Sequence, residues 1–136
     1  MADVSGITAV RPGSSATQVR PPVQYGATIA AGQPVYPSSG KMLLADANLS
    51  DAAAAAVGIS VTPGVDNGWG LIAFGGPIIL VGATLVVGET YVVSDTAGGI
   101  MPISDLSTGE RCTILGTAAT TTQLNLDINA TGITRA

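Results

Sequence analysis

A chain of 136 residues that is 46% hydrophobic and 10% charged is long enough for one buried core and too apolar for intrinsic disorder. So few charged residues leave little charge to cover a free surface, so we expect part of the apolar surface to contact another protein. The five basic residues are scattered, which argues against binding to nucleic acid or to a membrane surface.

Residues 1–24 are predicted to form an extended N-terminal arm, and residues 25–136 a β-rich domain. The segments 11–15 and 20–22 contain proline, which has no amide hydrogen to donate to a sheet. A short edge strand is expected at residues 17–20, and a frayed terminus is the alternative to an ordered arm. The start of the chain lacks the pattern of a signal peptide, and its longest apolar run is too short to cross a bilayer as a helix, so we expect a soluble protein.

A hairpin and a short helix are the next predicted elements. Residues 35–36 and 41–44 are apolar runs joined by four residues that include proline, two serines and glycine, which favours a tight turn. Ser50 can cap a helix in the alanine run that follows it, and Asp51 suits the first turn of that helix. The helix candidate spans residues 48–57 and is expected to make about two turns.

Strand patterns then recur until residue 129. Residues 77–81 are apolar on both faces, which indicates either a strand covered on two sides or a strand at an interface. Residues 84–87 are predicted to form a further strand. Residues 123–129 alternate between apolar and polar, as expected for a strand with one face buried. The tail, residues 131–136, is expected to be loose.

The composition favours a mainly β fold. The chain has 13 Val, 11 Ile and 15 Thr, whose β-branched side chains fit a pleated sheet, and 18 Gly and 8 Pro to form its turns. Strand patterns spaced by roughly eight to twelve residues are typical of barrels and sandwiches. We therefore predict a small single-domain β-barrel or sandwich with one short helix and the extended arm.

Catalytic groups are hard to find in this sequence. Without histidine, the chain lacks the commonest general base and metal ligand. Glu89 and Glu110 each follow a glycine and are expected to be solvated turn residues, and Cys112 a small buried side chain. Residues 46–51 begin like a calcium loop but depart from its glycine and glutamate positions, so helix capping is the better interpretation and a calcium ion at a subunit contact a minor one. We predict no enzyme activity, no cofactor and no bound metal.

Five short segments carry a resemblance to a known family. They are residues 31–36 (AGQPVY), 56–60 (AVGIS), 88–94 (GETYVVS), 97–102 (AGGIMP) and 115–118 (LGTA). Between about residues 25 and 132 the chain resembles the capsid-cement (head decoration) proteins of tailed bacteriophages, whereas residues 5–22 lie outside the shared pattern. The resemblance implies a small barrel-like body, often trimeric, that sits on the outer capsid surface and braces neighbouring coat subunits.

From these patterns we expect a structural virion protein that is made in the bacterial cytoplasm and binds the major capsid protein as a homotrimer. The predicted subunit-contact residues are Trp69, Ile78, Ile79 and Leu80. The predicted capsid-contact residues of the arm are Arg11, Pro12, Arg20, Pro21 and Pro22. The alternative is a glycan-binding β module associated with a phage tail or fibre, which would use exposed aromatic side chains. The aromatic residues are Tyr25, Tyr36, Trp69, Phe74 and Tyr91.

Overall fold

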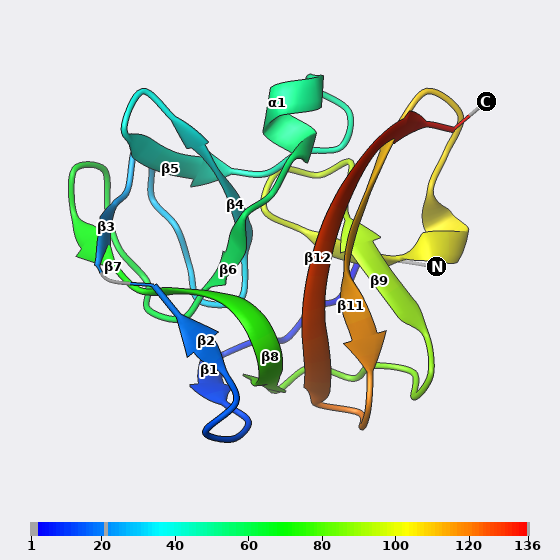
Figure 1. Ribbon diagram of the computed structural model, residues 1–136, viewed down its shortest axis with the longest axis horizontal. Helices are drawn as coiled ribbons and strands as arrows, with labels where there is room; N and C mark the ends of the chain where they lie inside the picture. The colour runs from blue at the N-terminus through cyan, green and yellow to red at the C-terminus, as the bar shows by residue number, and fades with distance from the viewer. Residues whose placement is uncertain (1–2, 21, 136) are drawn as a thin grey trace.

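Strands account for about 47% of the computed structural model and helices for about 5%, which confirms the mainly β prediction. The structure describes residues 3–20 and 22–135. Figure 1 shows the elements along the chain. They are β1 (Ala9–Pro12), β2 (Gln18–Val19), β3 (Val23–Gln24), β4 (Pro34–Ser38), β5 (Lys41–Leu44), α1 (Asp51–Ala54), β6 (Gly58–Ser60), β7 (Trp69–Gly70), β8 (Ile72–Val81), β9 (Thr90–Val93), β10 (Ile100–Pro102), the 3₁₀ turn η1 (Ile103–Asp105), β11 (Arg111–Ala118) and β12 (Gln123–Thr134).

Ten strands in the described part of the chain form one antiparallel sheet that curls into a half-barrel (Figure 1). The order along the sheet is β10-β9-β11-β12-β8-β6-β4-β5, and β1 and β2 also pair with β8. β3 pairs with β7 in a separate two-stranded ribbon. The prediction of a small barrel or sandwich is confirmed in this curled form. β8 is central to it because it pairs with β1, β2, β6 and β12.

The predicted hairpin is present as β4 and β5. Ser38 pairs with Lys41 at its tip. The two residues between them, Ser39 and Gly40, have φ values of 52° and 81°. Two successive positive φ angles are what a two-residue type I′ turn requires, and such a turn matches the right-handed twist of the flanking strands.

The helix α1 begins where the sequence predicts and ends earlier. The Ser50 hydroxyl accepts a hydrogen bond from the Ala53 amide at 3.0 Å, as expected of an N-cap. The helix stops after Ala54, so it makes about one turn rather than two. The cause lies in the residues that follow, because the Val57 amide donates to the Val35 carbonyl of β4 at 2.9 Å and draws the chain into the sheet.

Three strand boundaries differ from the prediction. β8 continues through its proline without a break, and Gly76, with φ of 79°, provides the bend. The strand predicted at residues 84–87 is wrong, because this segment is a loop in which the Val86 amide donates to the Tyr91 hydroxyl at 2.9 Å. Residues 131–134, expected to be loose, continue β12 and extend its pairing with β11.

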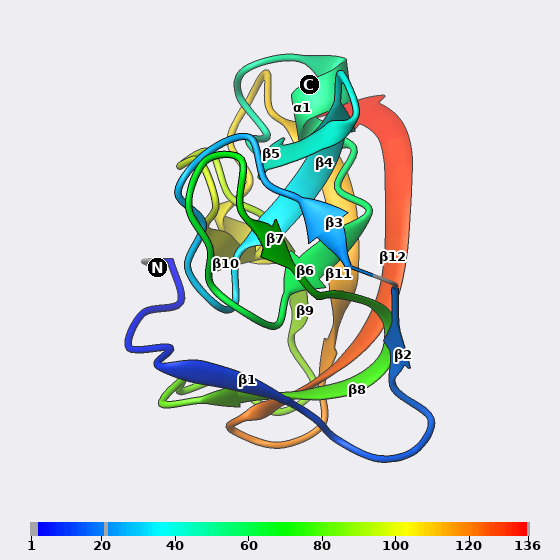
Figure 2. The ribbon, with the colours of Figure 1, turned by 90° about the vertical axis from the view of Figure 1, so that its left-hand side faces the viewer.

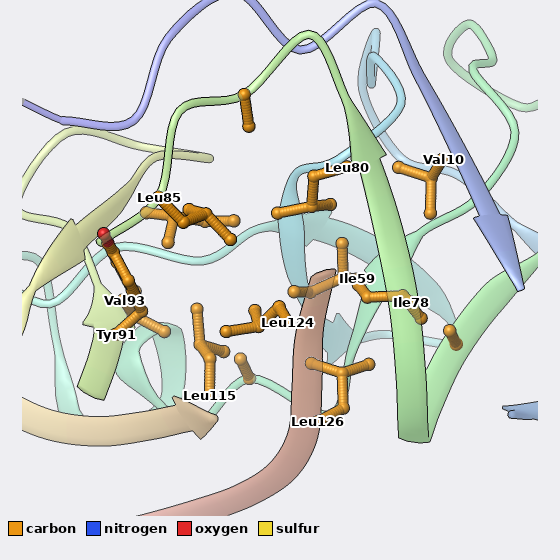
Figure 3. Packing of buried hydrophobic residues seen from close by; sticks show 14 of the residues in the cluster. Val10, Ile59, Ile78, Leu80, Leu85, Tyr91, Val93, Leu115, Leu124 and Leu126 are labelled. Carbon is orange, nitrogen blue, oxygen red and sulfur yellow. The ribbon is translucent and has the colours of Figure 1, made fainter. Parts of the chain in front are cut away.

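The main core lies inside the curl of the sheet (Figure 3). Ile78 and Leu80 point into it from β8, and Leu124 meets them from β12. All three side chains are fully buried. A second cluster forms around Tyr25 and Ile72 where the β4–β5 hairpin closes over the start of β8. Each cluster therefore combines residues that lie far apart in the sequence.

The N-terminal segment is extended and lies along the body. β1 pairs with β8 from Ala9 opposite Val81 to Pro12 opposite Ile78. Val10 is buried in the main core. β2 forms the short strand expected at residues 17–20 and also pairs with β8. Through β1 and β2, the arm is therefore part of the main sheet.

Candidate functional site

The structure separates the four residues predicted for a subunit contact. Trp69 lies on β7 with 66% of its surface exposed, and Ile79 is half-buried. Ile78 and Leu80 are fully buried in the chain's own core, so in this conformation they offer no surface to a partner. One of the two apolar faces of this run in β8, formed by Ile78 and Leu80, is apolar because it packs inward against the core of the same chain. Trp69 is thus the most accessible part of the predicted contact.

The turn before Trp69 carries a second exposed apolar side chain. Val65, four residues earlier, is 63% exposed, and the Gly68 amide closes the intervening turn by donating to the Val65 carbonyl at 2.8 Å. The turn also contains Asn67, which has a positive φ of 66°. Two large apolar side chains in one tight, hydrogen-bonded segment are costly to leave in water, and such surfaces mark protein contacts.

Tyr25 supports this surface from below, a role that the sequence did not reveal. Its ring is fully buried, and its hydroxyl donates to the Thr62 carbonyl at 2.7 Å. Tyr91 is buried as well, so these two aromatic rings are out of reach of a sugar. Among the aromatic residues considered for glycan binding, Trp69 and Phe74 are exposed.

The arm residues predicted to contact a capsid lie on the outside of the sheet. Arg11, Pro12, Arg20 and Pro22 are exposed, and Pro21 lies outside the described residues. Arg11 lies in β1 and Arg20 directly follows β2, and Figure 2 shows these two strands on the side of the molecule that faces the viewer. Contact of these residues with a capsid stays a prediction.

The remaining basic residues have partners. Lys41 donates to the side-chain oxygen of Asn67. Arg111 pairs with Asp51 at 2.8 Å. Arg135 donates to a backbone carbonyl near the C-terminal end of the sheet. By contrast, the side chains of Arg11 and Arg20 make no hydrogen bond or ion pair within residues 3–20 and 22–135.

Glu110 is the titratable group whose environment the sequence misjudged. It was expected to be solvated, but it is 4% exposed, and its carboxylate accepts a hydrogen bond from the Ser107 amide at 2.6 Å. Burial raises the pKa of the Glu110 carboxyl above its ordinary value of 4.5, the Ser107 hydrogen bond opposes the rise, and the carboxylates of Asp95 and Asp46 add to it. Three acids from three separate loops thus meet at this end of the molecule.

The raised pKa of Glu110 predicts that the free energy of unfolding depends on pH. Because folding raises the pKa of Glu110, the protonated form stabilises the fold fully below about pH 4.5, and this contribution is lost as the pH rises through the folded-state value. We expect Glu110→Gln to match the parent protein in acid and to be more stable at neutral pH. Urea denaturation at a series of pH values measures this. A difference between the two proteins that is constant with pH would contradict the expectation.

Residues 46–51, considered as a calcium loop, use their polar groups to build the start of α1. The Asp46 carboxylate accepts from the Asn48 amide at 2.9 Å, Ser50 caps the helix, and Asp51 pairs with Arg111. Over the residues that the structure describes, no three His, Cys, Asp or Glu side chains are grouped so that they could hold a metal ion. The capping interpretation of this segment is confirmed.

Hollows on the surface are small. One of about 200 Å³ lies between residues 4–7, 30–33 and 98–100, and another of about 160 Å³ adjoins it near Tyr91. Ligand pockets are usually roughly 300–1,000 Å³ in volume. The larger hollow is lined by small, apolar and amide side chains together with backbone. The exposed apolar surface around Trp69 is therefore the stronger candidate for a functional site.

No family model matches the chain, and no curated protein matches it. In the described part of the chain, no helix has the length and apolar character needed to span a membrane. The function therefore has to be inferred from the fold, the exposed residues and the resemblance carried by the short segments.

Proposed function

We propose that this protein is a capsid-cement protein of a tailed bacteriophage, which binds the outer capsid as a homotrimer and stabilises the shell without catalysing a reaction. The observation that carries the proposal is the exposed apolar surface of Trp69 and Val65 on a curled sheet with few charges. An adhesive protein needs such a surface, because burial of apolar area is the main favourable term in most protein association. The short resembling segments point to the same class.

The shape of the chain suits adhesion to a repeating shell. A sheet held by a continuous core is a stiff platform, so its surface groups lose little freedom when they bind. Burying one large apolar side chain contributes roughly 2 kcal/mol. Three copies linked in a trimer then bind several coat subunits at once, and avidity makes the assembly tight although each contact is weak.

Copurification tests the proposal. We expect the protein to remain with purified virions at a fixed ratio to the major capsid protein, and the purified chain to bind shells that lack it until the same ratio is reached. The ratio is measured by quantitative gel densitometry or mass spectrometry. Absence from virions, or binding that never saturates, would rule out a cement role.

The substitution Trp69→Ala tests whether the exposed apolar surface around Trp69 contributes to shell binding. Tryptophan is a frequent hot spot, and truncating one commonly costs about 2 kcal/mol, or roughly thirtyfold in affinity. We therefore expect shells to bind Trp69→Ala at least tenfold more weakly in a titration. Val87→Ala is the matched control, because Val87 is similarly exposed but lies in the loop before β9. If both variants bind like the parent protein, this surface plays no part.

The glycan-binding alternative uses the same tryptophan in a different way. An exposed indole can stack on a sugar ring, and Phe74 is a second partly exposed aromatic residue. A glycan array with the parent protein and Trp69→Ala separates the two functions. Saturable binding to one sugar that is lost in the variant would favour the glycan module, whereas cement activity predicts an array without signal.

A further inference from the structure

An Asn-Gly pair lies in the turn before β7, the strand that Figure 2 shows beside β3. Asn67 is the one asparagine of the chain that a glycine follows, since Asn48 and Asn125 precede leucine and Asn129 precedes alanine. Glycine has no Cβ, so its backbone nitrogen can be approached closely. An asparagine followed by glycine is therefore the place where a backbone nitrogen most readily attacks a side-chain amide.

The reaction open to this pair is spontaneous deamidation, the chemistry that makes asparagine thermolabile. The Gly68 nitrogen gives its proton to water and bonds to Cγ of Asn67. The bond from Cγ to Nδ2 breaks, and the departing nitrogen takes a proton from water and leaves as ammonia. Water then opens the cyclic succinimide at one of its two carbonyls. The product is aspartate or isoaspartate, and in isoaspartate the backbone is longer by a methylene group.

Lys41 activates the Asn67 side chain for this attack. Its ammonium group, at the tip of the β4–β5 hairpin, donates to Oδ1 of Asn67. Attack on Cγ places negative charge on Oδ1, and a cation already bound to this oxygen stabilises that charge. Asn67 is exposed, so water reaches the amide. The fold therefore supplies an electrophilic group that the sequence alone keeps far from the pair.

The peptide unit between Asn67 and Gly68 is held at both ends. The Gly68 amide donates to the Val65 carbonyl at 2.8 Å, and Nε2 of Gln24 donates to the Asn67 carbonyl at 3.1 Å. The Gly68 nitrogen cannot lose its proton and turn toward Cγ while both bonds are made. Breaking them needs only a local opening of the turn, which costs far less than unfolding the protein.

We infer that Asn67 is a modification site of the folded protein, where the turn opens locally and Lys41 promotes conversion of the side-chain amide to an acid. The site needs the fold, because Lys41 and Gln24 reach the turn from β5 and β3. The inference goes beyond the proposed function, since the chemistry is the same whatever the surface around Trp69 binds.

Conversion would change the exposed apolar surface in two ways. A carboxylate at residue 67 adds a negative charge to the turn. The isoaspartate form also shifts the backbone between two paired positions: the Tyr25 amide donates to the Gly68 carbonyl at 2.8 Å, and Trp69 pairs with Gln24. An added methylene group cannot fit this register without moving Trp69. The surface therefore has a limited chemical lifetime in water.

Peptide mapping by mass spectrometry of the full chain, incubated at neutral pH, measures the conversion. In the native protein we expect Asn67 to react at least tenfold faster than Asn48, Asn125 and Asn129, whose following side chains hinder attack. The two hydrogen bonds should make it roughly tenfold to a hundredfold slower than in the chain unfolded by guanidinium. Asn67 that stays intact in the native protein but reacts in the unfolded chain overturns the inference.

Asn67→Gly is the unreactive reference. Glycine accommodates the positive φ of 66° at this position and has no amide to lose. We expect the tryptophan fluorescence of the parent protein to drift as isoaspartate accumulates, and that of Asn67→Gly to stay constant. Equal drift in both proteins would mean that the conversion does not move Trp69.

Two substitutions beside Asn67 should change the native rate in opposite directions. Lys41→Met removes the cation and should slow the conversion roughly threefold or more, whereas Gln24→Leu frees the Asn67 carbonyl and should speed it by a similar factor. Neither should alter the rate in the unfolded chain. Gln123→Leu, the same change on β12, is the control and should keep the rate of the parent protein at Asn67.

The sign of the Lys41→Met effect separates activation from support of the turn. If Lys41 only held the turn in place, its removal would loosen the turn and speed the conversion. A faster reaction in Lys41→Met therefore overturns its promoting role, and a Gln24→Leu variant that reacts like the parent protein overturns the gating by local opening.

Discussion

Leu80→Ala is expected to lower the free energy of unfolding of the isolated chain by about 2–5 kcal/mol, the usual cost of truncating a buried leucine. Leu80 is fully buried and points into the main core with Ile78 and Leu124 (Figure 3). Removing its branched end leaves a cavity that the surrounding strands cannot fill, because β8 is held on both edges. Urea denaturation at several protein concentrations measures the loss and separates folding from association.

Ile79→Ala on the same strand is the matched control. Ile79 is half-buried and faces away from the core, so its truncation should cost about 1 kcal/mol or less. The reverse ranking, with Leu80→Ala neutral for folding and harmful to self-association, would mean that β8 opens and presents this face to a partner. That result would restore the interface role predicted for Ile78 and Leu80.

The double apolar pattern of β8 illustrates what a sequence cannot decide. Residues 77–81 read as apolar on both faces, and this pattern suits an internal strand and an interface strand equally. Whether the strand is internal or at an interface depends on which residues pack against it in the folded protein. Leu124, which meets Ile78 and Leu80, is more than 40 residues further along the chain, and its register on β8 follows from the curl of the whole sheet.

Local features were predictable because a few neighbouring residues determine them. The turn at Ser39 and Gly40 needs two positive φ angles, and the cap at Ser50 needs one hydroxyl beside one free amide. The end of α1 depends instead on a hydrogen bond to β4, so the sequence predicted a helix that continues too far along the chain. Glu110 was misjudged for a similar reason, since its neighbours Asp95 and Asp46 come from loops that the sequence keeps far apart.

Part of the candidate site could be predicted from the sequence. Trp69 was predicted as a contact residue together with the apolar stretch that follows it, and it is exposed. The buried Tyr25 that supports the turn before Trp69 comes from a distant part of the chain, and this contact could not be predicted from the sequence.

Gly70→Ala is expected to destabilise the protein by about 3 kcal/mol and to disturb the surface around Trp69. A Cβ at Gly70 would overlap the ring and hydroxyl of Tyr25, with 2.6 Å to Cε2. The ring cannot move aside easily, because it is fully buried and its hydroxyl is bound to the Thr62 carbonyl. Denaturation measures the stability, and the fluorescence of the one tryptophan reports on its displaced neighbour.

A shorter side chain at residue 25 should relieve this overlap. In a Tyr25→Leu background, the additional cost of Gly70→Ala should fall by more than half, since contacting residues are not additive. Gly88→Ala is the comparison for backbone strain alone: Gly88 has φ of 85° and no atom within 4 Å of a Cβ, so about 1–2 kcal/mol is expected. If Gly70→Ala costs the same in both backgrounds, the close packing of Tyr25 on β7 is not what positions Trp69. The exposed apolar surface would then lack the rigid support that makes it suitable for tight association.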